Sequence, residues 1–328
     1  EKALRTLEYH KIIDLLVRHA NCEAAKQRCK KLTPMTSLAD IETAQRQTAD
    51  ALSRIFKKGS LSFLGVHDVT ASMKRLEIGA ALSIEELLHL ASLLEVAKRA
   101  KAYSRNDRTE EAETSDSLDE FFDAIEPLTP LLEEIRRCII SSDEISDDAS
   151  SNLKSIRRSI RSTGDRIHAQ LNQMLNNQNV RNCLQDFVIT MRNGRYCLPV
   201  KAEAKSQITG MVHDQSSTGS TFFIEPAAVV NLNNQLKELD LQEQEEIEVI
   251  LGDLSSQAAV HTSELAADQK IMTTLDFIFA KAKLAMEQNA TEPIFNTEHY
   301  IQIRKGRHPL LDLSLIHISE PTRPRLIS

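Results

Sequence analysis

The sequence predicts a mainly α protein with a helical core, two long antiparallel helices and a small four-stranded antiparallel β module at their tip. Three observations favour this fold class. The 328-residue chain has 4% aromatic residues, no Trp, nine Gly and nine Pro, a composition that is usual in long helical proteins. Two long segments carry apolar residues at helical spacing. Between these segments, the apolar pattern changes to the period of two that is typical of strands.

Composition and charge exclude several classes of protein. The net charge is −7 and the pI is about 5.9, so nucleic-acid binding would need a local basic patch. The sequence has no apolar run of about 18 residues, so it predicts no membrane span. The first ten residues lack the apolar core of a signal peptide. The five scattered cysteines form no CxxC pair. They indicate reduced thiols and a cytoplasmic protein, with no disulfide or zinc framework.

Residues 1–150 are predicted to form the helical core. Helices fill most of residues 1–58, with a break at Thr33-Pro34, and Gly59 follows two lysines as a C-cap. We expect residues 59–82 to be irregular.

A capping box of Ser83 and Glu86 then predicts a helix to about Tyr103. Residues 104–120 read as a solvated loop because they are almost entirely polar. Two short helices are expected over residues 121–148.

Two helical arms follow the core. The outgoing arm, 151–184, has an apolar seam and a basic polar side; the returning arm, 226–290, is acidic and has no internal proline before Pro293. If the returning helix is continuous from Pro226, about 60 residues would span roughly 90 Å. We expect Arg157, Arg158 and Arg161 to pair with the acidic arm, and nucleic-acid contact is their alternative use.

The β module, residues 185–225, is predicted from its alternation and from its turns. Asn193-Gly194 between two β-prone runs is a strong hairpin signal, because a type I′ turn needs positive φ at both positions. The four strands expected in this module cover residues 187–191, 196–200, 207–213 and 221–224.

The stretch VHDQSSTGSTFFIEP, residues 212–226, contains the loop from Asp214 to Ser220, which joins the last two expected strands. Its hydroxyls and glycine suggest either a phosphate cradle or a simple hairpin connection. The P-loop pattern GxxxxGK[ST] is absent, since the stretch has one Gly, no following Lys and no helix directly after it. We therefore favour the connection, and expect Glu225-Pro226 to cap the returning helix.

Four cations of the β module are candidate contacts to the phosphates of DNA or RNA: Arg192, Arg195, Lys201 and Lys205. The alternative is that they are ordinary solvated strand edges, and nearby carboxylates keep the module almost neutral. His213-Asp214 could form an acid–base pair, but without a nucleophile or metal cluster we expect a structural role. We find no catalytic residue and no metal-ligand set.

The segment 187–247 resembles the clamp and returning lever of the second bacterial MutS subfamily, here called MutS-two. It begins FVITMRNGRYCLPV and contains the hydroxyl-rich stretch. The resemblance covers about residues 1–312. Further matching segments are ALRTLEYHKIIDLL, VHDVTASMKRLEIGAALSIEELL and RKGRHPLLD, at 3–16, 66–88 and 304–312.

This resemblance implies a dimer with core, lever and clamp parts. Complete members carry an ATPase domain, which uses ATP and Mg, and a C-terminal nuclease domain. The family is linked to binding branched or mismatched DNA, to suppression of recombination, and to rescue of collided ribosomes through ribosomal RNA. Arg307 and His308 match the segment that enters the ATPase domain near its nucleotide, so we expect residues 291–312 to begin that domain.

After Asp312 the chain departs from the family pattern. No GxxxxGK[ST] occurs, and residues 313–328 resemble translated adapter or vector sequence, so we expect a foreign tail. ATP hydrolysis and nuclease action are therefore not expected in this chain. The predicted function is a non-catalytic lever and clamp on branched DNA or ribosomal RNA. The alternative is a coiled-coil dimerisation scaffold without nucleic-acid binding.

Overall fold

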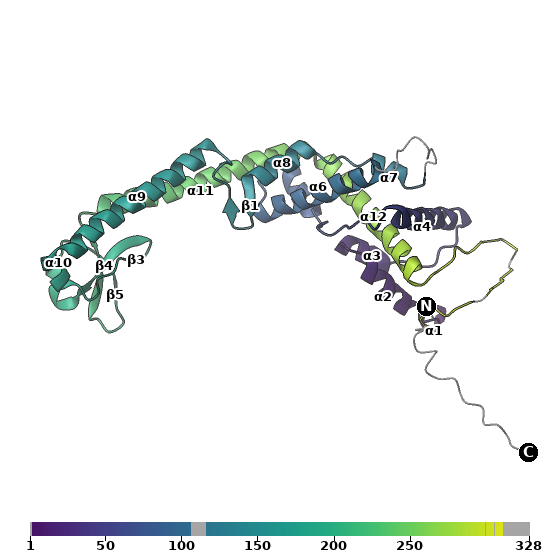
Figure 1. The fold of residues 1–328 in the computed structure, drawn as a ribbon, viewed down its shortest axis with the longest axis horizontal. Coiled ribbons are helices and arrows are strands. Elements are labelled where there is room, and N and C mark those ends of the chain that lie inside the picture. The colour runs from purple at the N-terminus through teal and green to yellow at the C-terminus, as the bar shows by residue number, and fades with distance from the viewer. Residues whose placement is uncertain (1, 106–115, 299, 305, 311–328) are drawn as a thin grey trace, which may run out of the picture. The chain divides into compact units, whose positions relative to one another are not determined.

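A computed structural model describes residues 2–105, 116–298, 300–304 and 306–310. The chain divides into two compact units, which are considered separately. The arm unit contains residues 80–84 and 133–257, and the core unit contains the remaining described residues. Helices dominate both units and the larger of two small antiparallel sheets has four strands (Figure 1), which confirms the predicted fold class. Of the described helices, none is long and apolar enough to cross a membrane.

The core unit is built around the last long helix of the chain, α12. This helix contacts α2, α3, α4 and α5. The helices of the unit are α1 (Lys2–Thr6), α2 (Tyr9–His19), α3 (Glu23–Lys30), α4 (Leu38–Lys58), α5 (Thr70–Glu77), α6 (Ile84–Arg105), α7 (Asp119–Asp123) and α12 (Thr262–Glu287). Gly59 follows the end of α4 with a φ of 82°, as predicted, and Ser37 Oγ accepts from Asp40 N at 3.5 Å at the start of the helix.

Aromatic rings fill the centre of the core unit. Phe63, Phe122 and Phe279 are fully buried, and the Phe63 and Phe279 centroids lie 5.7 Å apart in an edge-on arrangement. Arg54 closes one side of this cluster. Its guanidinium lies over Phe122 at 4.7 Å and bonds both carboxylate oxygens of Asp116 at 2.5 and 2.7 Å, which compensates its burial.

One prediction for the core, that residues 59–82 are irregular, was wrong, and two others were confirmed only in part. The first helical stretch is divided into α1, α2 and α3, and the first division follows Glu8, which has a φ of 52°. Residues 59–82 contain α5, whose buried Met73 and Leu76 are too few to produce a clear period. The region 121–148 ends in a hairpin of β1 (Ile139–Ser141) and β2 (Glu144–Ile145), after α8 (Thr129–Cys138). Most of the predicted solvated loop, 106–115, lies outside the described residues.

Two carboxylates of α12 are buried within the core unit. Asp276 accepts backbone hydrogen bonds from Asn21 and Cys22, at 2.8 and 2.7 Å, and so fixes the start of α3. Asp268 accepts one such bond from Glu126 N at 3.0 Å, and its Oδ2 has no partner among the described residues. Burial raises the pKa of Asp268 to about 6 because it disfavours the charged form.

The arm unit pairs α9 (Ser151–Asn176) with α11 (Val230–Ala259) in antiparallel orientation (Figure 1). At one end, Arg157 Nε lies 2.6 Å from Glu243 Oε1, which confirms the predicted pairing of the basic arm with the acidic arm for this residue. At the other end, Ile167 and Leu171 share a buried cluster with the first turns of α11. Arg161 pairs instead with Asp147, in the segment before α9.

The returning helix differs from its prediction at both ends. It begins at Val230, since Pro226 pairs with Gly210 as the last residue of a strand. The predicted capping by Glu225-Pro226 was therefore wrong. The helix also ends at Ala259, and Val260 and His261 separate it from α12. A single helix of about 60 residues is thus absent from this described stretch. The outgoing arm likewise ends in a separate short helix, α10 (Gln178–Cys183).

The β module has the strand order β3-β4-β6-β5, and all its pairs are antiparallel. Its elements are β3 (Thr190–Arg192), β4 (Arg195–Lys201), the 3-10 helix η1 (Ala202–Gln207), β5 (Gly210–Gln215) and β6 (Thr221–Pro226). The predicted turn is confirmed, since Asn193 and Gly194 have φ values of 51° and 72°. The first strand, β3, and the third strand, β5, begin later than predicted. The start of β5 is later because residues 202–207 form η1.

A buried ionic network fixes the β module to α11. Glu225, on β6, is 0% exposed and accepts from Arg195 Nη1 at 2.8 Å and from Asn233 Nδ2 at 2.8 Å. His213 Nε2 lies 2.5 Å from the other carboxylate oxygen of Glu225. Asn233 also bonds both backbone groups of Tyr196, each at 3.2 Å. One carboxylate therefore joins β4, β5, β6 and the returning helix.

Replacing Glu225 with Gln should destabilise the β module by about 3 kcal/mol, because Arg195 would lose its buried counter-charge. Local hydrogen exchange of β4 and β6, followed by mass spectrometry, measures this loss directly. Asp186→Asn, which removes one exposed carboxylate of the same module, serves as the control. Equal exchange in both variants would show that the network does not hold the module.

The raised pKa of Asp268 predicts a pH dependence of core stability. The folded state holds the proton of the Asp268 carboxyl more tightly than the unfolded chain does. The stabilisation that this proton provides is therefore full below about pH 4 and is lost as pH rises through about 6. Between these limits the free energy of unfolding of the natural chain should fall by up to about 3 kcal/mol relative to that of Asp268→Asn. Urea unfolding at several pH values measures the difference. Glu42→Gln, at an exposed position of α4, should show no such trend; a matching trend would contradict the assignment.

Candidate nucleic-acid interface

Arg192 ends β3 and presents a half-exposed charge on the β module. Its guanidinium lies over the ring of Phe223, 4.1 Å from the centroid. Its Nε is 3.3 Å from Asp214 Oδ2, and 41% of the side chain is exposed. The ring orients the guanidinium without neutralising it.

The two candidate lysines lie on either side of the start of η1. Lys205 is exposed, and its Nζ lies 4.4 Å from the centroid of Phe222. Lys201 is half-buried and its Nζ donates to Asn182 O at 3.2 Å. Neither contact is with a carboxylate, so both ammonium groups keep their positive charge on this surface.

Arg195 has a different environment from the other three candidates. It bonds Glu225 and also donates from Nη2 to Asn234 Oδ1 at 2.6 Å, and only 20% of its side chain is exposed. Glu225 therefore compensates the charge of Arg195 inside the module. The sequence pattern, which placed Arg192 and Arg195 together at the turn, could not separate these environments.

Arg181, on α10, is a cation that sequence reasoning missed. Its guanidinium lies 4.4 Å from the centroid of Phe187, and both side chains are exposed. The signal available in the sequence was a basic residue shortly before an aromatic residue, which is too common to be specific. Together, Arg181, Arg192, Lys201 and Lys205 are called the clamp cations below.

The buried pair of Arg195 and Glu225 changes which charges of the module reach its surface, but it leaves the net charge of the module unchanged. Glu225 and Arg195 neutralise one another in the interior. The carboxylates that stay exposed are those of Asp186, Glu203 and Asp214. Within the module, Arg192, Lys201 and Lys205 balance these three carboxylates, and Arg181 of α10 adds one further positive charge beside it. Asp214 already pairs with Arg192.

The hydroxyl-rich stretch connects β5 to β6, which confirms the predicted hairpin connection. Ser216 N donates to Thr221 O at 2.9 Å, and Ser216 Oγ accepts from Thr221 N at 3.1 Å. The Thr218 and Ser220 hydroxyls lie 2.8 Å apart, and Gly219 has a φ of 72°. The hydroxyls therefore serve the turn itself.

His213 and Asp214 point to different partners, Glu225 and Arg192, as the structural interpretation of this pair expects. Burial raises the pKa of the nearby Cys197 thiol to about 11, which makes it a poor nucleophile at neutral pH. Within the described ranges, no group of three or more His, Cys, Asp or Glu side chains could hold a metal ion.

Arg307 and His308 lie in the segment after α12, whose described residues form no helix or strand. Arg307 Nη2 donates to Asn289 O at 3.3 Å, and His308 Nδ1 accepts from Leu310 N at 3.3 Å. These local contacts place neither residue beside a nucleotide site. Their proximity to nucleotide in a complete protein stays a prediction.

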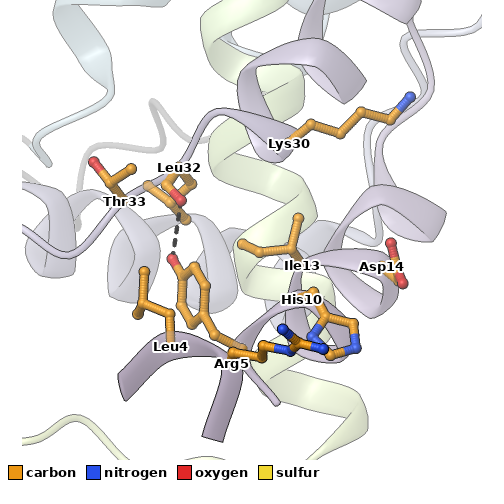
Figure 2. Close-up of a pocket in the computed structure, with 9 residues that line it drawn as sticks. Leu4, Arg5, His10, Ile13, Asp14, Lys30, Leu32 and Thr33 are labelled. Atoms are coloured by element: carbon orange, nitrogen blue, oxygen red, sulfur yellow. Dashed lines mark hydrogen bonds between the residues drawn. The ribbon is translucent and has the colours of Figure 1, made fainter. Parts of the chain in front are cut away.

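The core unit also has an open pocket of about 490 Å³ near the N-terminus. Figure 2 shows Arg5 and His10 in the lining of this pocket, with Lys30 extending away from it. The Tyr9 hydroxyl donates to Leu32 O at 3.1 Å, and burial raises the pKa of that hydroxyl. Asp14 also lines the pocket, so its charge is mixed.

Comparison with known proteins identifies the family. The chain is 57% identical over 312 residues to Endonuclease MutS2 of Agathobacter rectalis, covering 95% of this chain and 39% of that protein. It is 52% identical over 316 residues to Endonuclease MutS2 of Lachnoclostridium phytofermentans, covering 95% and 40%. The protein of that name from Clostridioides difficile is 40% identical over 312 residues, covering 95% and 39%. No family model matches the chain.

The chain thus spans about two fifths of the length of these curated relatives. The similarity extends through the core, both arms and the β module, since it covers 95% of the chain. On this similarity, together with the arm-and-module fold, the chain belongs to the MutS2 family.

Proposed function

We propose that this chain supplies the lever and clamp with which a dimeric MutS2 protein holds branched DNA or ribosomal RNA. The observation that carries this proposal is the placement of the clamp cations. Three of them, Arg181, Arg192 and Lys205, rest on aromatic rings of the β module. Arg181 lies on α10, Arg192 on β3 and Lys205 in η1, and α10 and the sheet lie at the end of the paired arm helices (Figure 1).

A cation on an aromatic ring is well suited to phosphate binding. The ring restricts the side chain, so that less conformational entropy is lost when a phosphate binds. The N–H edge of a guanidinium stays available to phosphate oxygens while its face rests on the ring. Asp214 does not prevent this use of Arg192, because an ion pair this exposed contributes about 0–1 kcal/mol.

The paired arms provide the mechanical part of the proposal. The buried seam of α9 and α11 and the Arg157–Glu243 pair fix the register of the two helices. The Glu225 network then fixes the module to α11. A movement of α11 would therefore carry the clamp cations with it. In the complete protein, we propose that the ATPase domain supplies that movement.

ATP, magnesium and strand cleavage belong to the proposal only for the complete protein. The described residues offer no cluster suited to a metal ion, and the sequence contains no GxxxxGK[ST]. These residues do not fit a magnesium–nucleotide site, so we derive no catalytic step from them. The relatives are named endonucleases, and we propose the same activity for the complete protein, acting in the cytoplasm.

A second candidate function, a dimerising tip without nucleic-acid binding, is favoured by exposed apolar side chains on the module. Met191 on the edge strand β3 is 50% exposed, and Met211 on the opposite edge strand β5 is 47% exposed. Phe187, Val188 and Val212 are similarly exposed. Unpaired edges with apolar residues favour association with a second strand.

Removing Arg192 and Lys205 together, as Gln, should weaken binding to a four-way DNA junction and to a ribosomal RNA fragment. We expect the salt slope of log K to fall by about 1 for each lost phosphate contact. Titration at several salt concentrations measures both quantities, and a larger loss with one ligand would identify the main partner.

Arg158→Gln is the matched control, because Arg158 is an exposed cation of α9 outside the β module. It should leave affinity almost unchanged. If the double variant keeps both the affinity and the salt slope of the natural chain, phosphate contact by these residues is excluded. Arg195 is unsuitable for this test because its loss should disturb the Glu225 network.

The dimerising tip predicts a different result. Met191→Lys and Met211→Lys should convert a dimer to monomers, since each places a charge on an apolar edge. Multi-angle light scattering after gel filtration measures the mass. Val249→Lys, at a 55% exposed position of α11, should keep the dimer. A dimer that survives both module substitutions would contradict assembly through the sheet edges.

A further inference from the structure

The core unit contains a second pocket, separate from the β module and lined by cations. It has a volume of about 350 Å³ and lies between the end of α3, the following segment, α4 and α12. Arg28, Lys31 and Lys281 line it, and its lining includes no Asp or Glu. In a chain of net charge −7, three cations around one cavity without a carboxylate require an explanation.

Two of these cations, Arg28 and Lys281, have neighbours that orient them. Arg28 Nη1 donates to Thr274 Oγ1 at 2.9 Å. The guanidinium of Arg28 lies 4.8 Å from the centroid of Phe277, and Lys281 Nζ lies 5.0 Å from the same centroid. Phe277 is 7% exposed, so its ring orients the cations and is not free to stack on a base.

Lys281 is the least exposed cation of this set. Its Nζ donates to Ala44 O at 3.4 Å, at the upper limit for a hydrogen bond. The charged or titratable groups that act on it are Arg28 and Cys29, both of α3. Burial, assisted by the Arg28 charge, lowers the pKa of Lys281 to about 8. A bound anion would compensate this unfavourable environment.

We propose that this pocket binds a small phosphate-bearing anion through Lys281, Arg28 and Lys31. Three cationic side chains line it, and such cations are the donors that phosphate binding uses. Thr33 and Gln47 add neutral polar groups to the lining. Its volume and the partial burial of Lys281 favour a phosphate group on a small molecule over the backbone of a nucleic-acid chain. The pocket of Figure 2 is a poorer candidate because Asp14 lines it.

Isothermal titration of the chain with inorganic phosphate and with adenosine monophosphate tests this site. Lys281→Met, which keeps the apolar stem of the side chain, should weaken binding about tenfold or more; Lys31→Met, at an exposed position, should weaken it several-fold. Lys30→Met removes a neighbouring charge that does not line this pocket, and should leave binding unchanged. Tighter binding of the nucleotide than of phosphate would assign the site to phosphate esters; equal affinity would assign it to phosphate itself.

The protonation of Lys281 provides a readout that a nonspecific basic surface would lack. Adenosine monophosphate is a dianion above about pH 7, so its own charge is constant between pH 7.5 and 9. Over this range its apparent affinity should fall about tenfold, because only the protonated fraction of Lys281 binds. Lys281→Met should lose this pH dependence.

Three results would overturn the proposal. The first is equal weakening by Lys30→Met and Lys281→Met. The second is an affinity that does not change with pH. The third is binding of a single-stranded oligonucleotide at this pocket without measurable binding of either small anion.

Discussion

The buried carboxylate of Glu225 is the constraint on which the structure of the β module depends. A charge with no solvent exposure is stable only with partners, and its partners come from β4, β5 and α11. The network therefore requires that β4, β5 and β6 be paired and that the returning helix start beside the sheet. It also takes Arg195 out of the surface charge and leaves Arg192 as the exposed arginine of the hairpin.

The β module combines a charged surface with a well-packed interior. Its inner face contributes Leu198, Val200 and Ile224 to a buried cluster with both arm helices. Phe222 packs partly against this cluster and also supports Lys205, while Phe223 supports Arg192. Aromatic residues thus link the core of the module to its cationic surface.

Much of this fold could be predicted from the sequence, since periodicity and turn chemistry are local signals. The Asn193-Gly194 turn and the helix that ends at Gly59 are examples. The errors arose where tertiary contacts override local pattern. Pro226 suits a helix start, but the partners of Glu225 hold it in β6. Val260 and His261 carry no strong helix-breaking signal, yet α11 ends there.

The candidate sites were less predictable, because cation–π pairs and pockets join residues distant in sequence. Arg181 and Lys281 could not be selected before their neighbours were known. The central claim, that the clamp cations meet nucleic acid, is tested most directly by lysine-reactivity footprinting on a saturated complex with a four-way junction. If the clamp cations contact the junction, Lys201 and Lys205 should react less in the complex, with Lys237 of α11 as an internal reference. Unchanged reactivity of both module lysines at saturation would contradict it.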